Sequence, residues 1–125
     1  MSRSYLLSVV LVLGLAGCSE AAAPDNSDTS TANPQPRLGA RLISRFDCGS
    51  CHSIPGIRGA SGVVGPPLTA FARRAYIAGR RPNTAENLEN WLVNPRQTDA
   101  ETAMPDLGIS AQQARHIRAY LYTLK

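Results

Sequence analysis

Cysteine is scarce in this chain, and its scarcity excludes several classes of protein. Three cysteines occur in 125 residues, at positions 18, 48 and 51. A small domain held together by disulfides needs more than that. A structural zinc site needs about four ligands, and Cys48, Cys51 and His52 have only the distant His116 to join them. We therefore expect neither a disulfide scaffold nor a zinc site.

Long apolar runs and nucleic-acid signatures are also missing. The apolar run from Tyr5 to about Leu15 is shorter than the roughly twenty residues of a transmembrane helix. With Arg3 before it, this run has the form of a signal peptide. Since no basic stripe interleaved with aromatic residues is present, nucleic acid is not expected as a partner.

Acidic residues are few in the larger part of the chain. Between Ser19 and Pro36 there are three acids and no lysine or arginine. From Arg37 onward, twelve lysines and arginines stand against six acids, and almost every cation is arginine. The resulting excess of about six positive charges keeps a small domain soluble and can steer it toward an acidic partner.

The chemistry of the chain centres on the pentapeptide Cys48-Gly49-Ser50-Cys51-His52. Two thiols three residues apart lie on one side of a helical turn, and the next residue stays close to that side. Both sulfurs can then bond the vinyl groups of one porphyrin while the imidazole reaches the iron. Cys-x-x-Cys-His is the attachment signature of c-type haem. The alternatives are a thioredoxin-like redox pair, half of a zinc site, or chance.

We expect one covalently attached haem c, with Cys48 and Cys51 as its thioether residues and His52 as an iron ligand. A thiol–disulfide oxidoreductase would need a βαβ context around the cysteines, and the pattern of the chain provides none. Among the alternatives, the haem site is the one that an exported chain favours.

The end of the apolar run, Leu15-Ala16-Gly17-Cys18, resembles the lipobox of bacterial lipoproteins. That resemblance implies cleavage before Cys18 and acylation of its sulfur and amino group, and several acyl chains anchor a protein durably. The alternative is cleavage near Ala21-Ala22-Ala23, which gives a soluble periplasmic product. We expect a signal peptide at residues 1–17.

The domain organisation follows from composition. Residues 18–37 comprise the lipidated cysteine and a segment rich in Ala, Ser, Thr, Asn, Asp and Pro, which buries too little apolar surface to fold. We expect this segment to be a disordered linker and residues 38–125 to be the folded domain. Helical patterns dominate that domain, and no alternating run of adequate length predicts a sheet. The expected helices cover residues 38–47, 69–78, from 83 or 84 to 94, and from 110 to 124.

Several local signals refine these helices. In the first, Gly39 lies where another element can cross closely. In the last, Ser110 and Gln113 form a capping box. His116 lies about 120° from the centre of that helix's apolar face, at 100° per residue, and is therefore expected to point to solvent. The glycines between residues 53 and 68 are equally consistent with a flexible loop and with backbone passing close to a bulky neighbour.

Taken together, residues 38–124 resemble the class I mono-haem cytochromes c. The resemblance is carried by the pentapeptide, by Gly65-Pro66-Pro67-Leu68, by Trp91-Leu92-Val93-Asn94-Pro95, by Met104-Pro105 and by the amphipathic last helix. Residues 80–88 are similar to the cytochrome domain fused to some bacterial oxidase subunits. The lysines around the haem edge of well-known members are absent here, so their docking surface is not carried over.

The resemblance implies an all-α fold in which the first and last helices cross around the haem. It implies that the Pro66 carbonyl accepts the ring N–H of His52, and that Leu68 and Trp91 line the haem pocket. It also implies Met104 as the second axial ligand. Met104 is the methionine that remains once Met1 leaves with the signal peptide, although a lone methionine is often a core filler.

Histidine and methionine together fill the iron's coordination sphere, which suits electron transfer rather than catalysis. The expected function is a membrane-tethered periplasmic electron carrier, not an enzyme, with an oxidase, reductase or dehydrogenase as partner. The alternative is the electron-transfer haem subunit of a periplasmic dehydrogenase or oxidase complex. A haem sensor or peroxidase-like protein would require Met104 to leave the iron.

Overall fold

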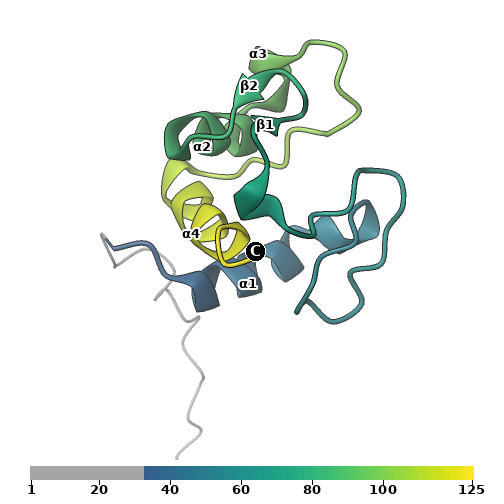
Figure 1. Ribbon diagram of the computed structural model, residues 1–125, viewed down its shortest axis with the longest axis vertical. Helices are drawn as coiled ribbons and strands as arrows, with labels where there is room; N and C mark the ends of the chain where they lie inside the picture. Colours follow the sequence, from purple (N-terminus) through teal and green to yellow (C-terminus); the bar gives the residue numbers. More distant parts are fainter. Residues whose placement is uncertain (1–32) are drawn as a thin grey trace, which may run out of the picture.

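The structure is a computed structural model that describes residues 33–125. The predicted signal peptide, the predicted lipidation of Cys18 and most of the predicted linker lie outside the described residues. The helices are α1 (Pro36–Arg45), α2 (Ala85–Val93), α3 (Pro95–Thr98) and α4 (Ala111–Leu121), with two short 3₁₀ turns, η2 (Cys48–Ser50) and η3 (Phe71–Arg73). The strands β1 (Tyr76–Ile77) and β2 (Arg81–Pro82) form a small antiparallel hairpin (Figure 1). None of these helices is long and apolar enough to cross a membrane.

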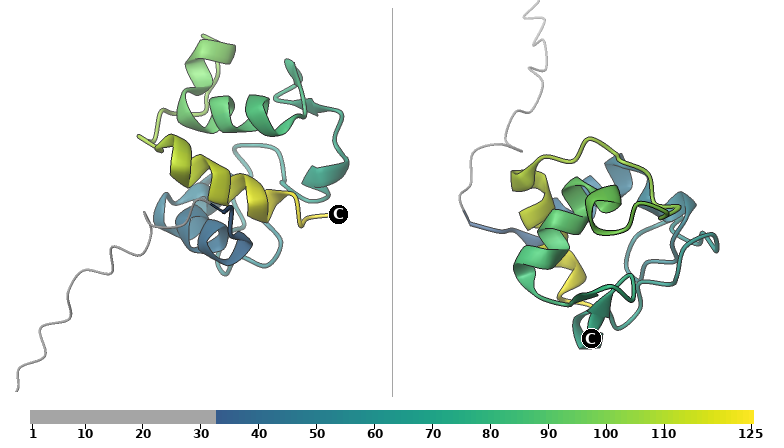
Figure 2. Two further views of the ribbon diagram at one scale, coloured as in Figure 1. Left: turned by 90° about the vertical axis from the view of Figure 1, so that its left-hand side faces the viewer. Right: turned by 90° about the horizontal axis from the view of Figure 1, so that it is seen from above.

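Three helices form a frame in which α4 is the central member. It lies between α2 on one side and α1 on the other, as the left view of Figure 2 shows. The crossing of α1 and α4 is close, because a Cβ atom on Gly39 would lie 2.7 Å from the carbonyl carbon of His116. The expected close crossing at Gly39 and the predicted all-α class with crossing first and last helices are confirmed.

The ends of the helices follow the capping signals of the sequence. Thr84 is the N-cap of α2 and accepts a hydrogen bond from the Asn87 N–H at 3.2 Å. Ser110 and Gln113 form the predicted capping box at the start of α4. Asn94 ends α2 and caps α3, in which Pro95 is the first residue.

The first helix differs slightly from its predicted range of 38–47. It begins at Pro36, since proline suits the first turn of a helix, where its missing N–H is not needed. It ends at Arg45 because Asp47 adopts the left-handed conformation, with φ of 52°. Aspartate tolerates this conformation better than most residues. The turn at Asp47 directs the chain from α1 into the pentapeptide.

The core is apolar, and α1, α2 and α4 contribute most of it. Each fully buried leucine or isoleucine contributes about 1.5–3 kcal/mol to folding. An ion pair of 2.7 Å between Arg118 Nε and Glu89 Oε1 joins α4 to α2 at the edge of this core. The buried apolar residues are Leu38, Leu42, Ile43, Ile54, Phe71, Ile77, Leu88, Trp91, Leu92, Ile109, Ala114, Ile117 and Leu121.

The helix predicted for residues 69–78 is wrong. Only the 3₁₀ turn η3 is helical there, and the chain then enters the hairpin of β1 and β2. Left-handed φ angles of 52° at Ala70 and 50° at Ala78 break the helix at both ends. The Asn83 side-chain amide donates hydrogen bonds of 3.0 Å to the carbonyls of Phe71 and Arg74, which a helix would have used itself.

The expected exposure of His116 is also wrong, because this side chain is 1% exposed. His116 lies off the centre of the apolar face of α4. However, α4 packs against both α1 and α2, so more than one side of this helix is buried. Its Nδ1 accepts a hydrogen bond of 3.0 Å from the backbone N–H of Gln35, the N-cap residue of α1. His116 therefore stabilises the start of α1 from across the helix crossing.

Candidate functional site

The pentapeptide forms a compact turn at the end of α1. The N–H groups of Cys51 and His52 both donate to the Cys48 carbonyl oxygen, at 3.3 and 3.0 Å. This bonding folds the five residues around one carbonyl, so that both cysteines and the histidine belong to a single turn. Cys48 and Cys51 are half-buried free thiols. A compact turn of this kind is what attachment of both sulfurs to one macrocycle requires.

The thiol of Cys48 is unsuited to redox exchange. Burial raises the pKa of Cys48 to about 11 from an ordinary 9.0, and the nearby Asp47 carboxylate adds to the increase while a backbone hydrogen bond opposes it. A thioredoxin-like pair needs a thiol whose pKa is lowered, because the thiolate is the attacking species. The environment of Cys48 therefore argues against a dithiol redox site.

His52 is held in one orientation by its neighbour along the loop. Its Nδ1 lies 2.8 Å from the Pro66 carbonyl oxygen. A carbonyl oxygen only accepts, so Nδ1 must carry the ring proton and Nε2 keeps its lone pair. An imidazole in this state is ready to bind a metal through Nε2.

Gly65 supports the same ring from one side. A Cβ atom on Gly65 would lie 2.6 Å from His52 Nδ1, so any side chain there would displace the imidazole. Because Gly65 has no side chain, the imidazole ring packs directly against its backbone. This contact and the hydrogen bond to Pro66 fix the ring together.

The rest of the loop wraps the pentapeptide through backbone hydrogen bonds. The Gly62 N–H donates to the Gly49 carbonyl at 3.0 Å, and the Gly65 N–H donates to the Cys51 carbonyl at 2.8 Å. A Cβ atom on Gly62 would lie 2.5 Å from the Ser50 carbonyl carbon, and one on Gly49 would lie 2.7 Å from the Ala60 Cα. Of the loop glycines whose role the sequence left open, Gly62 and Gly65 are required for close approach, whereas Gly59 has no atom within 4 Å of its Cβ position. Gly49 in the pentapeptide is required for close approach as well.

Two side chains from elsewhere in the chain hold the loop in place. Arg74 donates to the Thr69 carbonyl at 3.2 Å and also to the Pro67 carbonyl. The Tyr120 hydroxyl on α4 donates to the Pro55 carbonyl at 2.6 Å. Sequence reasoning did not identify either contact, since no motif pairs Arg74 with nearby carbonyls, and Tyr120 meets Pro55 only in the folded chain.

The remaining predicted site residues lie around the core rather than in the pentapeptide. Leu68 and Met104 are half-buried and pack against the apolar core, as Cys48 does. Trp91 on α2 is 8% exposed and belongs to the same core. The Met104 N–H donates to the Thr102 hydroxyl at 3.2 Å, in the loop between α3 and α4. Cys18 lies outside the described residues.

The residues present fit a covalently attached haem. Two adjacent thiols on one turn can form thioethers, and the imidazole of His52 offers a free Nε2 in a ring oriented by Gly65 and Pro66. Within residues 33–125, no group of three or more His, Cys, Asp and Glu side chains is placed to hold a metal ion without a macrocycle. Two thiols and one imidazole on a single turn are the donor set that a covalently attached haem requires.

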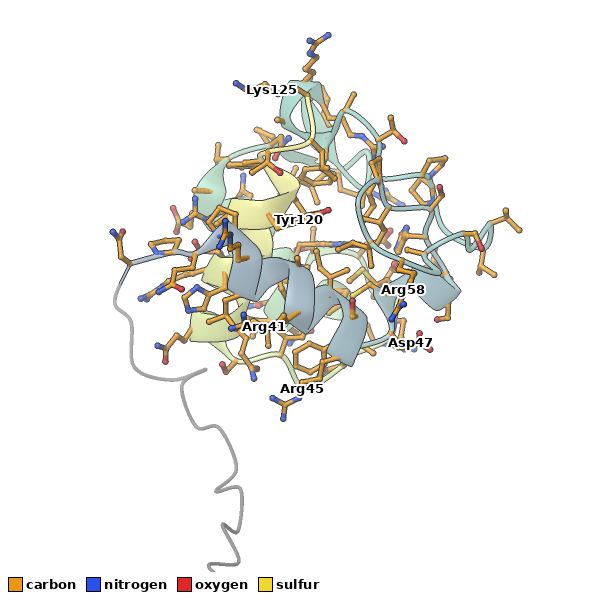
Figure 3. The ribbon with its side chains drawn as sticks, turned by 90° about the horizontal axis from the view of Figure 1, so that it is seen from below. Arg41, Arg45, Asp47, Arg58, Tyr120 and Lys125 are labelled. Atoms are coloured by element: carbon orange, nitrogen blue, oxygen red, sulfur yellow. The ribbon has the colours of Figure 1, made fainter. Side chains whose placement is uncertain are left out.

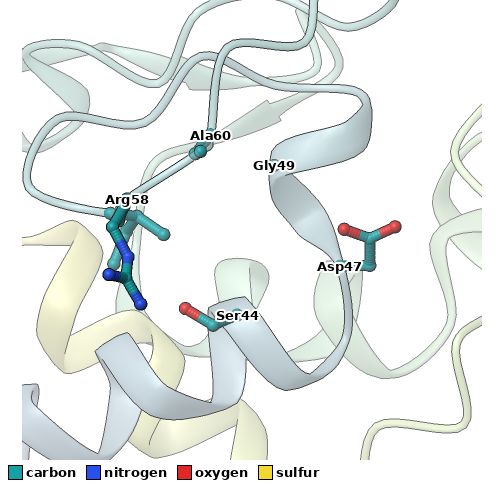
Figure 4. A pocket seen from close by; sticks show the side chains of 7 residues that line it. Ser44, Asp47, Gly49, Arg58 and Ala60 are labelled. Carbon is teal, nitrogen blue, oxygen red and sulfur yellow. The ribbon is translucent and has the colours of Figure 1, made fainter.

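A small hollow of about 80 Å³ lies between α1 and the loop, next to the pentapeptide. In Figure 4, the side chains of Ser44 and Arg58 point toward each other there, while the Asp47 carboxylate points away from them. Ligand pockets for drug-sized molecules are about 300 Å³ or more. This hollow is too small to be a substrate pocket.

Comparison with known proteins agrees with this geometry. The family model described as Cytochrome c matches residues 36–125. The cytochrome c oxidase subunit 2 of Alkalihalophilus pseudofirmus is 34% identical over 90 residues, which are 70% of this chain and 25% of that protein. The chain thus spans about a quarter of the length of that curated relative.

Proposed function

Because the chain belongs to the cytochrome c family, we propose that it is a membrane-tethered periplasmic cytochrome that carries single electrons through one haem ligated by His52 and Met104. Membership of the family implies a haem and a role in electron transfer. The axial ligands, the tether and the compartment are parts of the proposal. The observation that carries it is the 2.8 Å contact from His52 Nδ1 to the Pro66 carbonyl oxygen.

Each site residue has a distinct role in this proposal. Cys48 and Cys51 attach the haem through thioethers, and His52 binds the iron through Nε2. Pro66 and Gly65 keep the imidazole in place and make it a better ligand, since a hydrogen bond at Nδ1 raises the basicity of the ring. When bound, the haem supplies one-electron oxidation and reduction of its iron.

The other side of the iron is assigned to the Met104 thioether, with Leu68 and Trp91 as apolar residues of the haem pocket. All three pack on one apolar core, in which Trp91 is buried and Leu68 and Met104 are half-buried. Methionine opposite histidine raises the reduction potential. If His52 and Met104 both bound the iron, no position would be left for a substrate, and the protein is therefore proposed as a carrier and not an enzyme.

The tether is assigned to a lipid on Cys18, after removal of residues 1–17. The part of the predicted linker that precedes α1, residues 18–35, would then have an average reach of about 25 Å if it behaves as a flexible chain. Confinement within that reach raises the concentration of the domain near partners in the same membrane. Without the lipid, the alternative is a soluble periplasmic protein.

A second candidate is the electron-transfer haem subunit of a periplasmic oxidase or dehydrogenase complex. The matched relative is named as an oxidase subunit, and this favours the oxidase among the possible complexes. Purification of the native protein distinguishes the candidates. A free cytochrome supports the carrier, whereas stable co-purification with a catalytic subunit supports the complex.

The ligands are tested by optical spectroscopy of protein matured in a bacterial periplasm. The pyridine haemochrome is expected to report one c-type haem per chain, and the oxidised protein should show the weak long-wavelength sulfur-to-iron band. Met104→Ala should abolish that band, while Glu101→Ala, at an exposed position of the same loop, should keep it. Absence of the band in the wild type, together with ready binding of carbon monoxide, would contradict the carrier.

The tether is tested separately by cell fractionation. Cys18→Ala should release the cytochrome from the membrane fraction into the soluble periplasmic fraction. Unchanged retention of this variant in membranes would contradict the lipid anchor and leave the haem assignment intact.

A further inference from the structure

Tyr120 on α4 connects the helix crossing to the loop that follows the pentapeptide. Its Cβ atom lies at the crossing of α1 and α4, 3.0 Å from the position that a Cβ atom on Gly39 would take. Figure 3 labels Tyr120 on α4, beside α1. At the other end of the side chain, the hydroxyl donates to the Pro55 carbonyl oxygen at 2.6 Å. The side chain therefore links the helix crossing to the loop.

The loop makes room for this hydroxyl at Gly56. A Cβ atom on Gly56 would lie 2.6 Å from Tyr120 Oη, which is closer than real Cβ atoms come to other groups. Gly56 also has a φ of 79°, which glycine adopts more readily than other residues. Gly59 has the same φ of 79°, but no atom lies within 4 Å of its Cβ position. The two glycines thus differ in their contact with Tyr120.

The part of the loop that Tyr120 holds begins at His52 and is paired with the segment that contains Pro66. The Ser53 carbonyl, directly after His52, accepts the Leu68 N–H at 2.8 Å. The Pro66 carbonyl, two residues before Leu68, lies 2.8 Å from His52 Nδ1. Because these contacts are adjacent, a movement of the chain after His52 would also change the hydrogen bond at Nδ1.

We propose that Tyr120 is a positioning residue for the haem iron, which acts by fixing the hydrogen bond between His52 Nδ1 and the Pro66 carbonyl. The proposal rests on the proposed function, because this hydrogen bond matters to electron transfer only if His52 is an iron ligand. A hydrogen bond at Nδ1 makes the imidazole more basic, and contacts of this kind tune the reduction potential of a bound metal. Since a more basic ligand favours the oxidised iron, loss of the Tyr120 hydroxyl should make the potential more positive.

The first test removes the hydroxyl alone and is made on the holoprotein. In the reduced protein, Tyr120→Phe should speed the solvent exchange of the His52 Nδ1 proton, followed by NMR, by about fivefold, as expected for one hydrogen bond of ordinary net strength. The reduction potential should become more positive. Tyr122→Phe is the matched control, at the C-cap of the same helix. It removes a hydroxyl that donates to Asn83 Oδ1 at 3.1 Å instead of to the loop, and both readouts should stay unchanged.

The second test disturbs the same contact from the loop. Gly56→Ala should displace the Tyr120 hydroxyl and change the exchange rate and the potential in the same direction as Tyr120→Phe. Gly59→Ala has the same backbone strain but open space around its Cβ, so it is the matched control and should leave both readouts unchanged. In the double variant Tyr120→Phe/Gly56→Ala the two effects should be less than additive, because both remove one contact.

The outcomes separate the role of Tyr120 from the proposed function. If neither readout changes in Tyr120→Phe, or if both change equally in Tyr122→Phe, the positioning role is wrong and the carrier stands. Equal changes in Gly56→Ala and Gly59→Ala would also overturn it. If the oxidised wild-type protein lacks the sulfur-to-iron band and binds carbon monoxide, the carrier fails, whereas exchange of the His52 proton still decides the role of Tyr120.

Discussion

The helical frame and the site segment are stabilised in different ways. The frame of α1, α2 and α4 is stabilised by buried apolar side chains and by N-cap residues at the starts of α2 and α4. The site segment, residues 48–70, has little regular structure beyond η2, and backbone hydrogen bonds tie it to the pentapeptide. Its close contacts are made by glycines at 49, 62 and 65 rather than by interlocking side chains.

This difference indicates which part depends on the haem. The helices of the frame bury apolar side chains against one another without any cofactor. This burial stabilises the frame even when haem is absent. The site segment surrounds a turn whose thiols and imidazole are assigned to the haem, and few of its side chains are deeply buried. We therefore expect the two regions to respond differently when the haem is lost or when a contact is removed.

The largest effect is expected from the double variant Cys48→Ser/Cys51→Ser. Without thiols no thioether can form, so covalent haem should fall to zero in the pyridine haemochrome of denatured protein. Amide hydrogen exchange should rise by about tenfold or more in residues 48–70 and much less in α1 and α4, since locally stabilised segments open first. The measurement is exchange followed by mass spectrometry.

Ser50→Ala is the matched control for that variant. It lies within the same pentapeptide and removes a hydroxyl that donates to the Asp47 carbonyl at 2.8 Å, but it leaves both thiols in place. Covalent haem should be retained. Equal increases of exchange in the frame and in the site segment of the cysteine variant would show that the two regions are one cooperative unit.

A strong effect on the frame is expected from Gly39→Leu. The new side chain would collide with the His116 backbone, and a backbone group cannot rotate away as a flexible side chain can. We expect a loss of about 3 kcal/mol in the free energy of unfolding, measured by urea denaturation. Arg41→Ala, at an exposed position of the same helix, is the control and should change little. A leucine tolerated at position 39 would mean that the helices do not cross closely.

The frame was largely predictable from the sequence because its signals are local. The apolar stripe at Leu38, Leu42 and Ile43 gives the buried face of α1, and the Ser110 capping box gives the start of α4. Each signal depends on residues a few positions apart. A helix period can therefore be read without knowing what the helix packs against.

The errors arose where distant parts of the chain override local preference. His116 was expected at the surface because it lies off the apolar face of α4. In the structure it accepts a hydrogen bond from the backbone N–H of Gln35, at the start of a different helix. The segment 69–78 was expected to be helical. In the structure the Asn83 side-chain amide donates hydrogen bonds to two carbonyls of this segment, and the chain turns at Ala70. A single sequence does not display such long-range contacts.

For the site, the sequence predicted the residue types better than the way they are supported. The pentapeptide and the contact between Pro66 and His52 were expected, and the structure contains that contact. The support by Arg74 and Tyr120 was not expected, because both reach the loop from segments outside it. The axial role of Met104 stays a prediction.

His116→Ala should destabilise the frame less than Gly39→Leu. Removing the ring leaves the Gln35 N–H without its acceptor and opens space at the helix crossing, with an expected cost of about 1–3 kcal/mol. His116→Asn keeps an acceptor near the position of Nδ1 and should recover part of the loss. Thermal unfolding followed by circular dichroism measures both. If Ala and Asn are equally destabilising, the hydrogen bond to Gln35 is not what stabilises α1.

Gly65→Ala should affect the site and spare the frame. Its Cβ would press on the imidazole of His52, so the orientation of the ring and the spectrum of the bound haem should change. Gly59→Ala is the control in the same loop. No atom lies within 4 Å of its Cβ, but its φ is 79°, so it should cost about 1 kcal/mol of stability without altering the spectrum. An unchanged haem spectrum in Gly65→Ala would contradict the packing of the ring on this glycine.

The smallest effect concerns Cys48, which lies where the two regions meet. Cys48 packs on the apolar core, and burial raises its pKa to about 11. In the haem-free Cys51→Ala variant, the rate of alkylation by iodoacetamide should therefore keep rising with pH up to about 11, because only the thiolate reacts. Because the folded state holds this proton more tightly than the unfolded state, stability should also fall as pH rises from about 9 to 11.

The covalent holoprotein supplies the control for this titration, since a thioether has no proton to lose and neither pH effect should appear. A reaction in the haem-free protein that levels off near the ordinary thiol pKa of 9.0 would mean that Cys48 has left the core. In that case the whole site segment, including its first residue Cys48, would detach from the frame when haem is missing. A midpoint near 11 would instead place the boundary between the two regions after Cys48, with its thiol held by the frame before any haem arrives.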